Sequence, residues 1–121
     1  MDVFSAMARQ LGLATPTGVE ITEAQGRLTW SSDENYQAGL TLMAAIGQGN
    51  TAVTPLQLAV YAAALANCGQ RPALHFADRA VNAATGETVW QYTPTFTTVP
   101  GGEGVFGPIR DGMKRIDRKS T

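Results

Sequence analysis

The chain has 121 residues, the size of one compact domain, and carries 9 Lys and Arg against 10 Asp and Glu. Its net charge of −1 provides no basic field for a nucleic-acid backbone, so we expect no nucleic-acid partner. One Cys and one His can form neither an internal disulfide nor a zinc site of the usual ligand types. The sequence also contains no apolar run near the ~20 residues of a membrane-spanning helix, and no secretion signal.

The N-terminal third has the pattern of a helix, a short strand and a loop. Apolar residues recur at helical spacing over residues 3–11, with Asp2 placed to cap the helix and Gly12 placed to end it. The alternation over residues 19–22 predicts a short strand. Residues 23–37 are polar and aperiodic, and they predict a surface loop.

The central segment predicts a buried helix. An apolar stretch over residues 40–46 runs into Gly47-Gln48-Gly49, and Thr54-Pro55 combines an N-cap residue with Pro at the first helical position. The predicted helix over residues 55–67 is apolar on nearly every side, and Gly69 follows as its left-handed C-terminal residue. Such a helix needs neighbours all round, and the other predicted elements are too few to supply them. The pattern therefore indicates a piece of a larger domain.

The C-terminal third predicts a hairpin, a loop and a short helix. Residues 76–92 have the pattern of a β-hairpin, and residues 93–107, with two prolines and four glycines, predict a flexible loop. Ile109, Met113 and Ile116 place one apolar stripe on a short basic helix. For residues 1–121 we expect a single partial domain of the α+β class, mainly helical, with one β-hairpin.

The residue pattern offers no typical active site or metal centre. His75 has no identifiable partner as a general base, and Cys68 lies at a helix C-terminus, where the helix dipole disfavours a thiolate. No G-x-S-x-G turn occurs, and no Lys stands three residues after any of the four serines, Ser5, Ser31, Ser32 and Ser120. We predict no catalytic residue, no cofactor-binding residue and no metal ligand in this chain, and no cofactor.

One series of motifs is specific. Ile46-Gly47-Gln48-Gly49 is followed by Thr54-Pro55-Leu56-Gln57, and the helix ends in Ala66-Asn67-Cys68-Gly69. In this order and spacing, the motifs closely resemble the transpeptidase domain of the high-molecular-weight penicillin-binding proteins, which cross-link peptidoglycan. The flanks agree, because Thr17-Gly18-Val19-Glu20 is similar to the family's Thr-Gly-Ile-Asp/Glu turn, and Arg110-Asp111-Gly112-Met113 is similar to its Gly-Met segment.

The resemblance places the chain between the family's Ser-x-Asn and Lys-Thr-Gly motifs. It implies that Ser-x-x-Lys and Ser-x-Asn precede this segment and that Lys-Thr-Gly follows it. Lys119-Ser120-Thr121 matches the last motif only superficially, because Thr replaces the Gly. No catalytic residue of the family therefore carries over to this sequence. The resemblance implies a scaffold role for the matched residues, which are Gly47, Gln48, Gly49, Thr54, Pro55 and Gln57.

The implied function belongs to an intact parent protein. The resemblance implies the helical subdomain of a penicillin-binding-protein/β-lactamase-like fold, in a parent that is anchored in the membrane with this domain outside the cytoplasm. The expected partner is the remainder of the transpeptidase domain, and stem peptides and β-lactams would bind only through the parent. The alternative is a stand-alone binding or self-association module derived from this scaffold, in which exposed apolar surface favours a homodimer.

Overall fold

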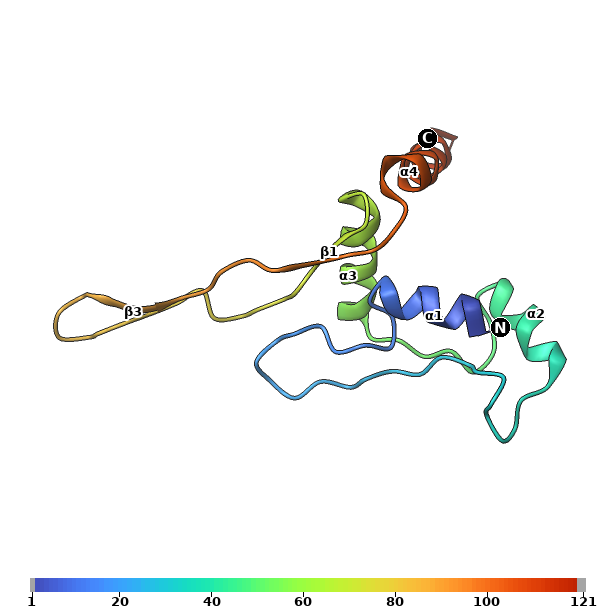
Figure 1. Cartoon of the computed structure of the whole chain (residues 1–121), viewed down its shortest axis with the longest axis horizontal. Helices are drawn as coiled ribbons and strands as arrows, with labels where there is room; N and C mark the ends of the chain where they lie inside the picture. The colour runs from blue at the N-terminus through green and yellow to red at the C-terminus, as the bar shows by residue number, and fades with distance from the viewer. Residues whose placement is uncertain (1, 120–121) are drawn as a thin grey trace.

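A computed structural model describes residues 2–119 of the chain. The described residues form four helices and four short strands (Figure 1). In chain order these elements are α1 (Asp2–Gln10), α2 (Ala38–Ala45), α3 (Pro55–Ala66), β1 (Gln70–Pro72), β2 (Arg79–Val81), β3 (Thr88–Gln91), β4 (Phe96–Thr98) and α4 (Gly102–Lys119). The mainly helical α+β prediction is confirmed.

Helix α1 ends where the sequence predicts. The Gly12 N–H donates to the Arg9 carbonyl at 3.0 Å and the Leu13 N–H donates to the Ala8 carbonyl at 2.9 Å, an arrangement that satisfies the last carbonyls of a helix. Asp2 differs from its expected capping role, because it is the first residue of α1 and its carboxylate accepts from the N–H of Ser31 at 2.9 Å. The side chain thus ties α1 to the following loop.

The strand predicted over residues 19–22 does not form, and this prediction is wrong. The segment approaches residues 74–77, but through too few bonds for a strand ladder. The Leu74 N–H donates to the Thr17 carbonyl at 2.9 Å, and the Glu20 carboxylate accepts from the N–H of Phe76 at 2.9 Å. The carboxylate of Glu20 therefore accepts the hydrogen bond that the backbone of a partner strand would otherwise accept.

The strands form one two-stranded arm that projects from the helices (Figure 1). At its base β1 pairs antiparallel with β4, with Gln70 opposite Thr98. Further out β2 pairs antiparallel with β3, with Arg79 opposite Gln91 and an irregularity at Ala80/Val81. The outer pair lies within the hairpin range expected from the sequence.

The stretch 93–107, expected to be a flexible loop, contains β4 and the beginning of α4. Pro94, Pro100 and Gly101 flank β4, whose residues Phe96–Thr98 pair with β1, whereas the other three glycines lie within α4. This part of the prediction is corrected, because the partner strand lies more than twenty residues earlier and leaves no local signal.

The buried core is small and divided. One cluster joins Ala8, Ala14 and Leu28, and a second joins Leu65, Val99 and Phe106. Helix α3 contributes Leu65 to the second cluster, but the helix is covered on one side only. Along its other side four apolar residues recur at helical spacing and are exposed: Leu58, Ala59, Ala62 and Ala66.

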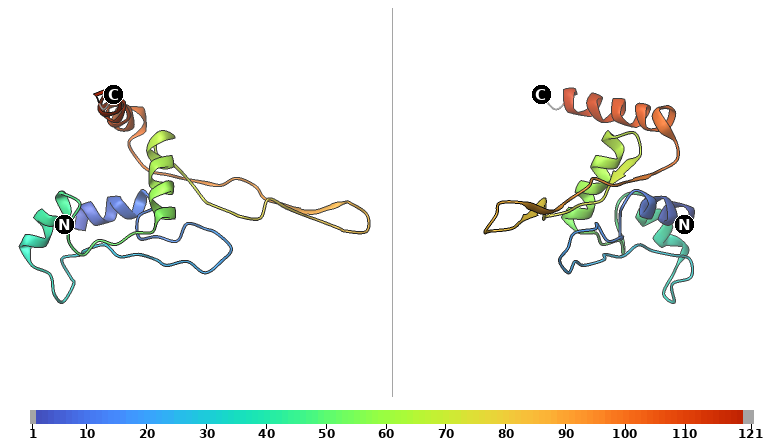
Figure 2. Two further views of the ribbon diagram at one scale, coloured as in Figure 1. Left: turned by 180° about the vertical axis from the view of Figure 1, so that it is seen from behind. Right: turned by 60° about the vertical axis from the view of Figure 1, so that its left-hand side comes forward.

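The molecule is open in shape. Figure 2 shows α4 and the arm standing away from α1 and α2. The solvent-accessible surface is 8379 Å², whereas a compact monomer of this mass exposes about 6,300 Å². An excess of about 2,000 Å² means that much of the apolar surface has no covering element within the described chain.

Candidate functional site

The first part of the motif region is the turn after α2. Gly47 has φ +74°, its N–H donates to the Ala44 carbonyl at 3.0 Å, and the Gln48 N–H donates to the Met43 carbonyl at 2.8 Å. Glycine suits this position because a left-handed φ costs it little. Gly49, at φ +96°, keeps the turn tight, while Gln48 is exposed.

The second part is the start of α3. The Thr54 hydroxyl accepts from the Gln57 N–H at 3.1 Å, and the Gln57 side-chain oxygen accepts from the Thr54 N–H at 3.1 Å. Pro55 occupies the first turn, where its missing N–H leaves no bond unmade. This reciprocal capping box satisfies two donors that a helix start otherwise leaves open.

Gln57 also holds two distant segments. Its amide is fully buried, and its Nε2 donates to the carbonyls of Thr15 at 3.1 Å and Gln25 at 2.9 Å. The side chain therefore uses its oxygen and both N–H groups, and it joins α3 to two stretches that lie 42 and 32 residues earlier. No sequence pattern signals these contacts, because they join residues far apart in the chain.

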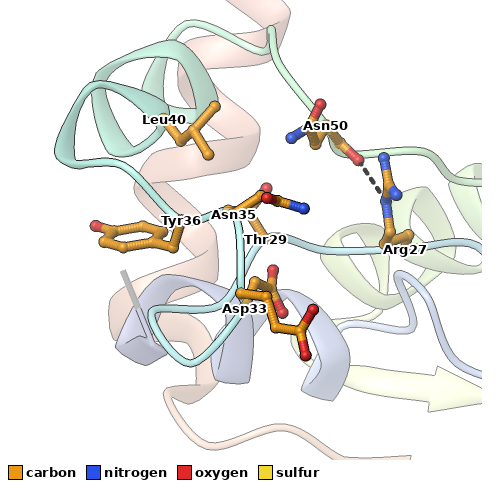
Figure 3. A pocket seen from close by; sticks show the side chains of 8 residues that line it. Arg27, Thr29, Asp33, Asn35, Tyr36, Leu40 and Asn50 are labelled. Atoms are coloured by element: carbon orange, nitrogen blue, oxygen red, sulfur yellow. Dashed lines mark hydrogen bonds between the residues drawn. The ribbon is translucent and has the colours of Figure 1, made fainter.

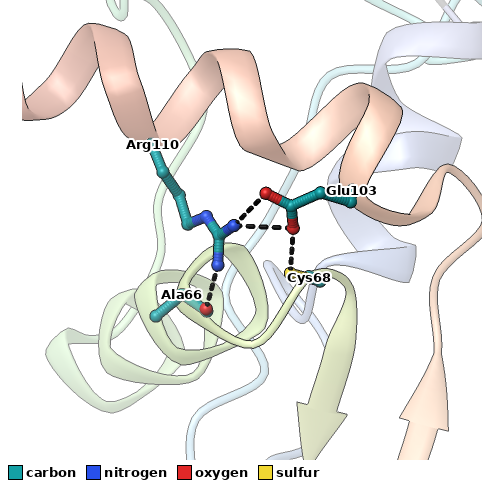
Figure 4. A network of polar contacts seen from close by, with 4 residues as sticks. All are labelled: Ala66, Cys68, Glu103 and Arg110. Carbon is teal, nitrogen blue, oxygen red and sulfur yellow. Dashed lines mark hydrogen bonds and ion pairs between the residues drawn. The ribbon is translucent and has the colours of Figure 1, made fainter.

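A polar network joins the C-terminal end of α3 to α4 (Figure 4). The Glu103 carboxylate accepts from the Cys68 thiol at 2.7 Å and from the Arg110 guanidinium at 2.6 Å. Arg110 also donates to the Ala66 carbonyl at 3.0 Å, one of the last carbonyls of α3. Cys68 itself has φ +53°, so the left-handed segment begins one residue before the predicted Gly69.

The network shifts the titration of two groups in opposite directions. The hydrogen bond from Cys68, and then the bond from Arg110, lower the pKa of the Glu103 carboxyl. The same thiol–carboxylate bond raises the pKa of Cys68, and burial adds to the effect. The thiol is therefore held protonated at neutral pH, which is the opposite of an activated nucleophile.

A polar cleft of about 300 Å³ lies between the loop after Leu28 and the turn before α3 (Figure 3). Its walls include Arg27, Asp33, Tyr36 and Asn50, and the Arg27 side chain donates to the Asn50 carbonyl at 3.1 Å. Charges of both signs line the cleft, and Asp33 is engaged with the Trp30 N–H at 2.8 Å. The arrangement fixes the loop conformation.

Two of the serines and the histidine considered as catalytic residues in the sequence make contacts within the fold. Ser5 is buried and its hydroxyl donates to the Thr29 carbonyl at 2.6 Å, while the ring of His75 stacks on Tyr92 at 3.4 Å. Ser31 donates to Asp2, and Ser120 lies outside the described residues, as does Thr121. Within residues 2–119 no group of three or more His, Cys, Asp or Glu side chains is placed to hold a metal ion.

Comparison with known proteins identifies the family. A family model described as the penicillin binding protein transpeptidase domain matches residues 1–115. The chain belongs to this family. Its relatives include the peptidoglycan D,D-transpeptidase MrdA of Salmonella typhimurium strains SL1344 and LT2, with 32% identity over 104 residues. That alignment covers 80% of this chain and 16% of the relative.

Solved structures of penicillin-binding proteins share this arrangement. Penicillin-binding protein 2B of Streptococcus pneumoniae strain R6 has 28% identity and a TM-score of 0.72 over 89% of this chain and 19% of that one. PBPA of Mycobacterium tuberculosis has a TM-score of 0.79 at 21% identity, over 92% of this chain and 25% of that one, a likeness of fold alone. The chain thus spans a quarter or less of the length of these proteins.

Among the helices of residues 2–119, none combines the length and the apolar composition that crossing a bilayer requires.

Proposed function

We propose that this chain is a scaffold segment of a penicillin-binding protein transpeptidase, and that it does no chemistry by itself. In the intact parent it would support peptidoglycan cross-linking and β-lactam binding. The observation that carries this proposal is the match of the family's domain over residues 1–115, together with the small share of each relative that the chain spans.

The geometry of the motif residues supports a scaffold role. Gly47 and Gly49 form a turn, Thr54 and Pro55 start α3, and Gln57 joins three segments through buried hydrogen bonds. Within residues 2–119, the hydrogen bonds of these residues go to other parts of the fold. Their task in the parent is to hold α3 in place as a support for the active site.

The chemistry of the parent follows from the family resemblance. An activated Ser outside this segment attacks the carbonyl between two D-Ala residues, the terminal D-Ala leaves, and an acyl-enzyme forms. An amine of a neighbouring strand then takes the acyl group and frees the Ser. β-Lactams acylate the same Ser. We also propose that the parent is membrane-anchored, with this domain outside the cytoplasm, and that the remainder of the domain is this segment's main partner.

A labelled β-lactam tests the proposal directly. The isolated 121-residue chain is expected to remain unlabelled, whereas the intact parent is expected to take up one label per molecule. Stoichiometric labelling of the isolated chain would overturn the assignment of a scaffold role. Sequencing the reading frame on both sides tests the alternative of a stand-alone module, since the catalytic motifs must flank a genuine transpeptidase segment.

Gln57→Leu in the intact parent tests whether Gln57 stabilises the fold or takes part in the reaction. The substitution is expected to lower the melting temperature while the acylation rate per folded molecule stays unchanged. Gln48→Leu is the comparison variant. The resemblance implies a scaffold role for Gln48 too, but its side chain is exposed and makes no hydrogen bond in the described structure, so the melting temperature should change little. A slower acylation rate at unchanged stability would assign Gln57 a direct catalytic role instead.

A further inference from the structure

The projecting arm is interrupted between its inner strand pair, β1 with β4, and its outer pair, β2 with β3. The inner pair ends with the bond from the Ala73 N–H to the Thr95 carbonyl at 3.0 Å. The outer pair begins with the bond from the Tyr92 N–H to the Asp78 carbonyl at 2.7 Å. Between these bonds, residues 74–77 of the outgoing side face only two residues of the returning side. We call residues 74–77 the bulge, since extra residues on one strand bend a ribbon at that point.

The N–H groups of the bulge bond to a segment that lies far earlier in the chain. The Leu74 N–H donates to the Thr17 carbonyl at 2.9 Å. The N–H groups of Phe76 and Ala77 donate to the two oxygens of the Glu20 carboxylate, at 2.9 and 3.4 Å. The bond from Phe76 lowers the pKa of the Glu20 carboxyl, so the group is ionised at neutral pH. One carboxylate therefore satisfies two donors that strand pairing leaves open.

The segment that carries Glu20 is itself fixed. The N–H and the hydroxyl of Thr17 donate to the Glu23 carboxylate, at 2.7 and 2.8 Å, and Thr17 is buried. Gly18 has φ +98°, and a Cβ added there would lie 3.4 Å from the Leu74 carbonyl. The segment thus lies close against the bulge and gives the arm a firm point of attachment.

The outer pair has little other support. Among the described elements, β2 and β3 contact each other and no other helix or strand, and Figure 2 shows this part of the arm standing apart from the helices. A two-stranded ribbon is only marginally stable in water. The Tyr92 hydroxyl donates to the Ala73 carbonyl at 3.0 Å, but this bond joins the two pairs of the arm to each other and not to the rest of the molecule. The direction of the outer pair therefore depends on the contacts of the bulge.

We propose that the bulge is a pivot of the arm and that the Glu20 carboxylate is the latch that fixes the direction of the outer pair relative to α3. With the carboxylate in place, the bulge is bound to a segment that is anchored elsewhere in the fold. Without it, the N–H groups of Phe76 and Ala77 bond to water, and the outer pair moves as a unit about the bulge. The proposal does not rest on the proposed function.

Distances between spin labels test the latch. In a Cys68→Ser background, labels at Ala59→Cys on the exposed side of α3 and at Ala83→Cys near the tip of the arm report the direction of the arm. We expect Glu20→Ala to broaden the distribution of this distance. Glu34→Ala is the matched control, because it removes an exposed carboxylate that makes no hydrogen bond in the described structure, and it should leave the distribution unchanged. Circular dichroism reports whether each variant keeps the fold.

Hydrogen exchange locates the movement. In Glu20→Ala the Leu74 N–H should exchange at least about tenfold faster, although its acceptor, the backbone of Thr17, is unchanged. The amides of Ala73 and Tyr92, which belong to the inner and outer pairs, should keep their protection.

Four results would overturn the proposal. The first is a distance distribution that Glu20→Ala leaves unchanged or that Glu34→Ala broadens equally. The second is unchanged exchange at Leu74. The third is lost protection at Ala73 or Tyr92, because the arm then frays instead of pivoting. The fourth is loss of the whole fold in Glu20→Ala, because the carboxylate then supports more than the arm.

Discussion

Gln57 shows how one buried polar side chain can specify the arrangement of three segments. We expect Gln57→Leu to lower the free energy of unfolding by about 3 kcal/mol, since it leaves the Thr54 N–H and the carbonyls of Thr15 and Gln25 without partners. Urea unfolding measures the change. Gln48→Leu should change the free energy by less than about 0.5 kcal/mol. If both variants lost the same free energy of unfolding, the buried hydrogen bonds of Gln57 would not be what holds the three segments together.

Gly69 carries both a conformational and a steric constraint. Its φ is +88°, and an added Cβ would lie 2.6 Å from the ring of Phe106 and 2.6 Å from the Val99 carbonyl. We expect Gly69→Ala to destabilise the chain by about 3 kcal/mol or more, whereas Gly86→Ala, also left-handed but in open space, should cost only about 1 kcal/mol. Thermal unfolding compares the two, and a similar loss for both would show that packing against Phe106 is unimportant.

At the scale of elements, the contact of α4 with α3 depends on the network of Glu103, Arg110 and Cys68. The pKa of Glu103 is lowered in the folded state, so its contribution is present above its ordinary value of 4.5 and is lost as the pH falls through the lower folded value. The pKa of Cys68 is raised, so its contribution is present below its ordinary value and is lost as the pH rises through the higher folded value.

We therefore expect the docking of α4 to weaken at both ends of the pH range. Hydrogen exchange of the α4 amides measures the docking as a function of pH. In Glu103→Gln the acid-side loss should vanish, because the titrating carboxyl is gone. A wild-type profile that stays flat below pH 4.5 would show that the carboxylate does not hold α4 in place.

At the scale of the whole molecule, the surface exceeds that of a compact monomer by about 2,000 Å². The apolar face of α3, and the exposed Val105, Ile109 and Met113 of α4, contribute to this excess. If the remainder of the domain covers these faces in the intact parent, as we propose, the amides of α3 and α4 should exchange faster in the isolated chain than in the parent. Equal protection in both would mean that these faces have no cover in the parent.

Local chemistry made several elements predictable. The helix stop at Gly12, the start of α3 after Thr54 and the hairpin around residues 82–87 depend on residues within a few positions of one another. The family was also evident from the order and spacing of short motifs, and the family model confirms it. These features need no knowledge of the rest of the fold.

Only the tertiary structure decided how the segments meet. The strand expected over residues 19–22 was replaced by contacts of Thr17 and Glu20, and β4 appeared in a stretch expected to be a loop, because strand formation depends on a distant partner. The same reason applies to the bonds of Gln57 with Thr15 and Gln25. The sequence by itself determined the end of α1, the capping box at the start of α3 and the family. Contacts between residues far apart in the chain decided which apolar faces are covered and which remain open.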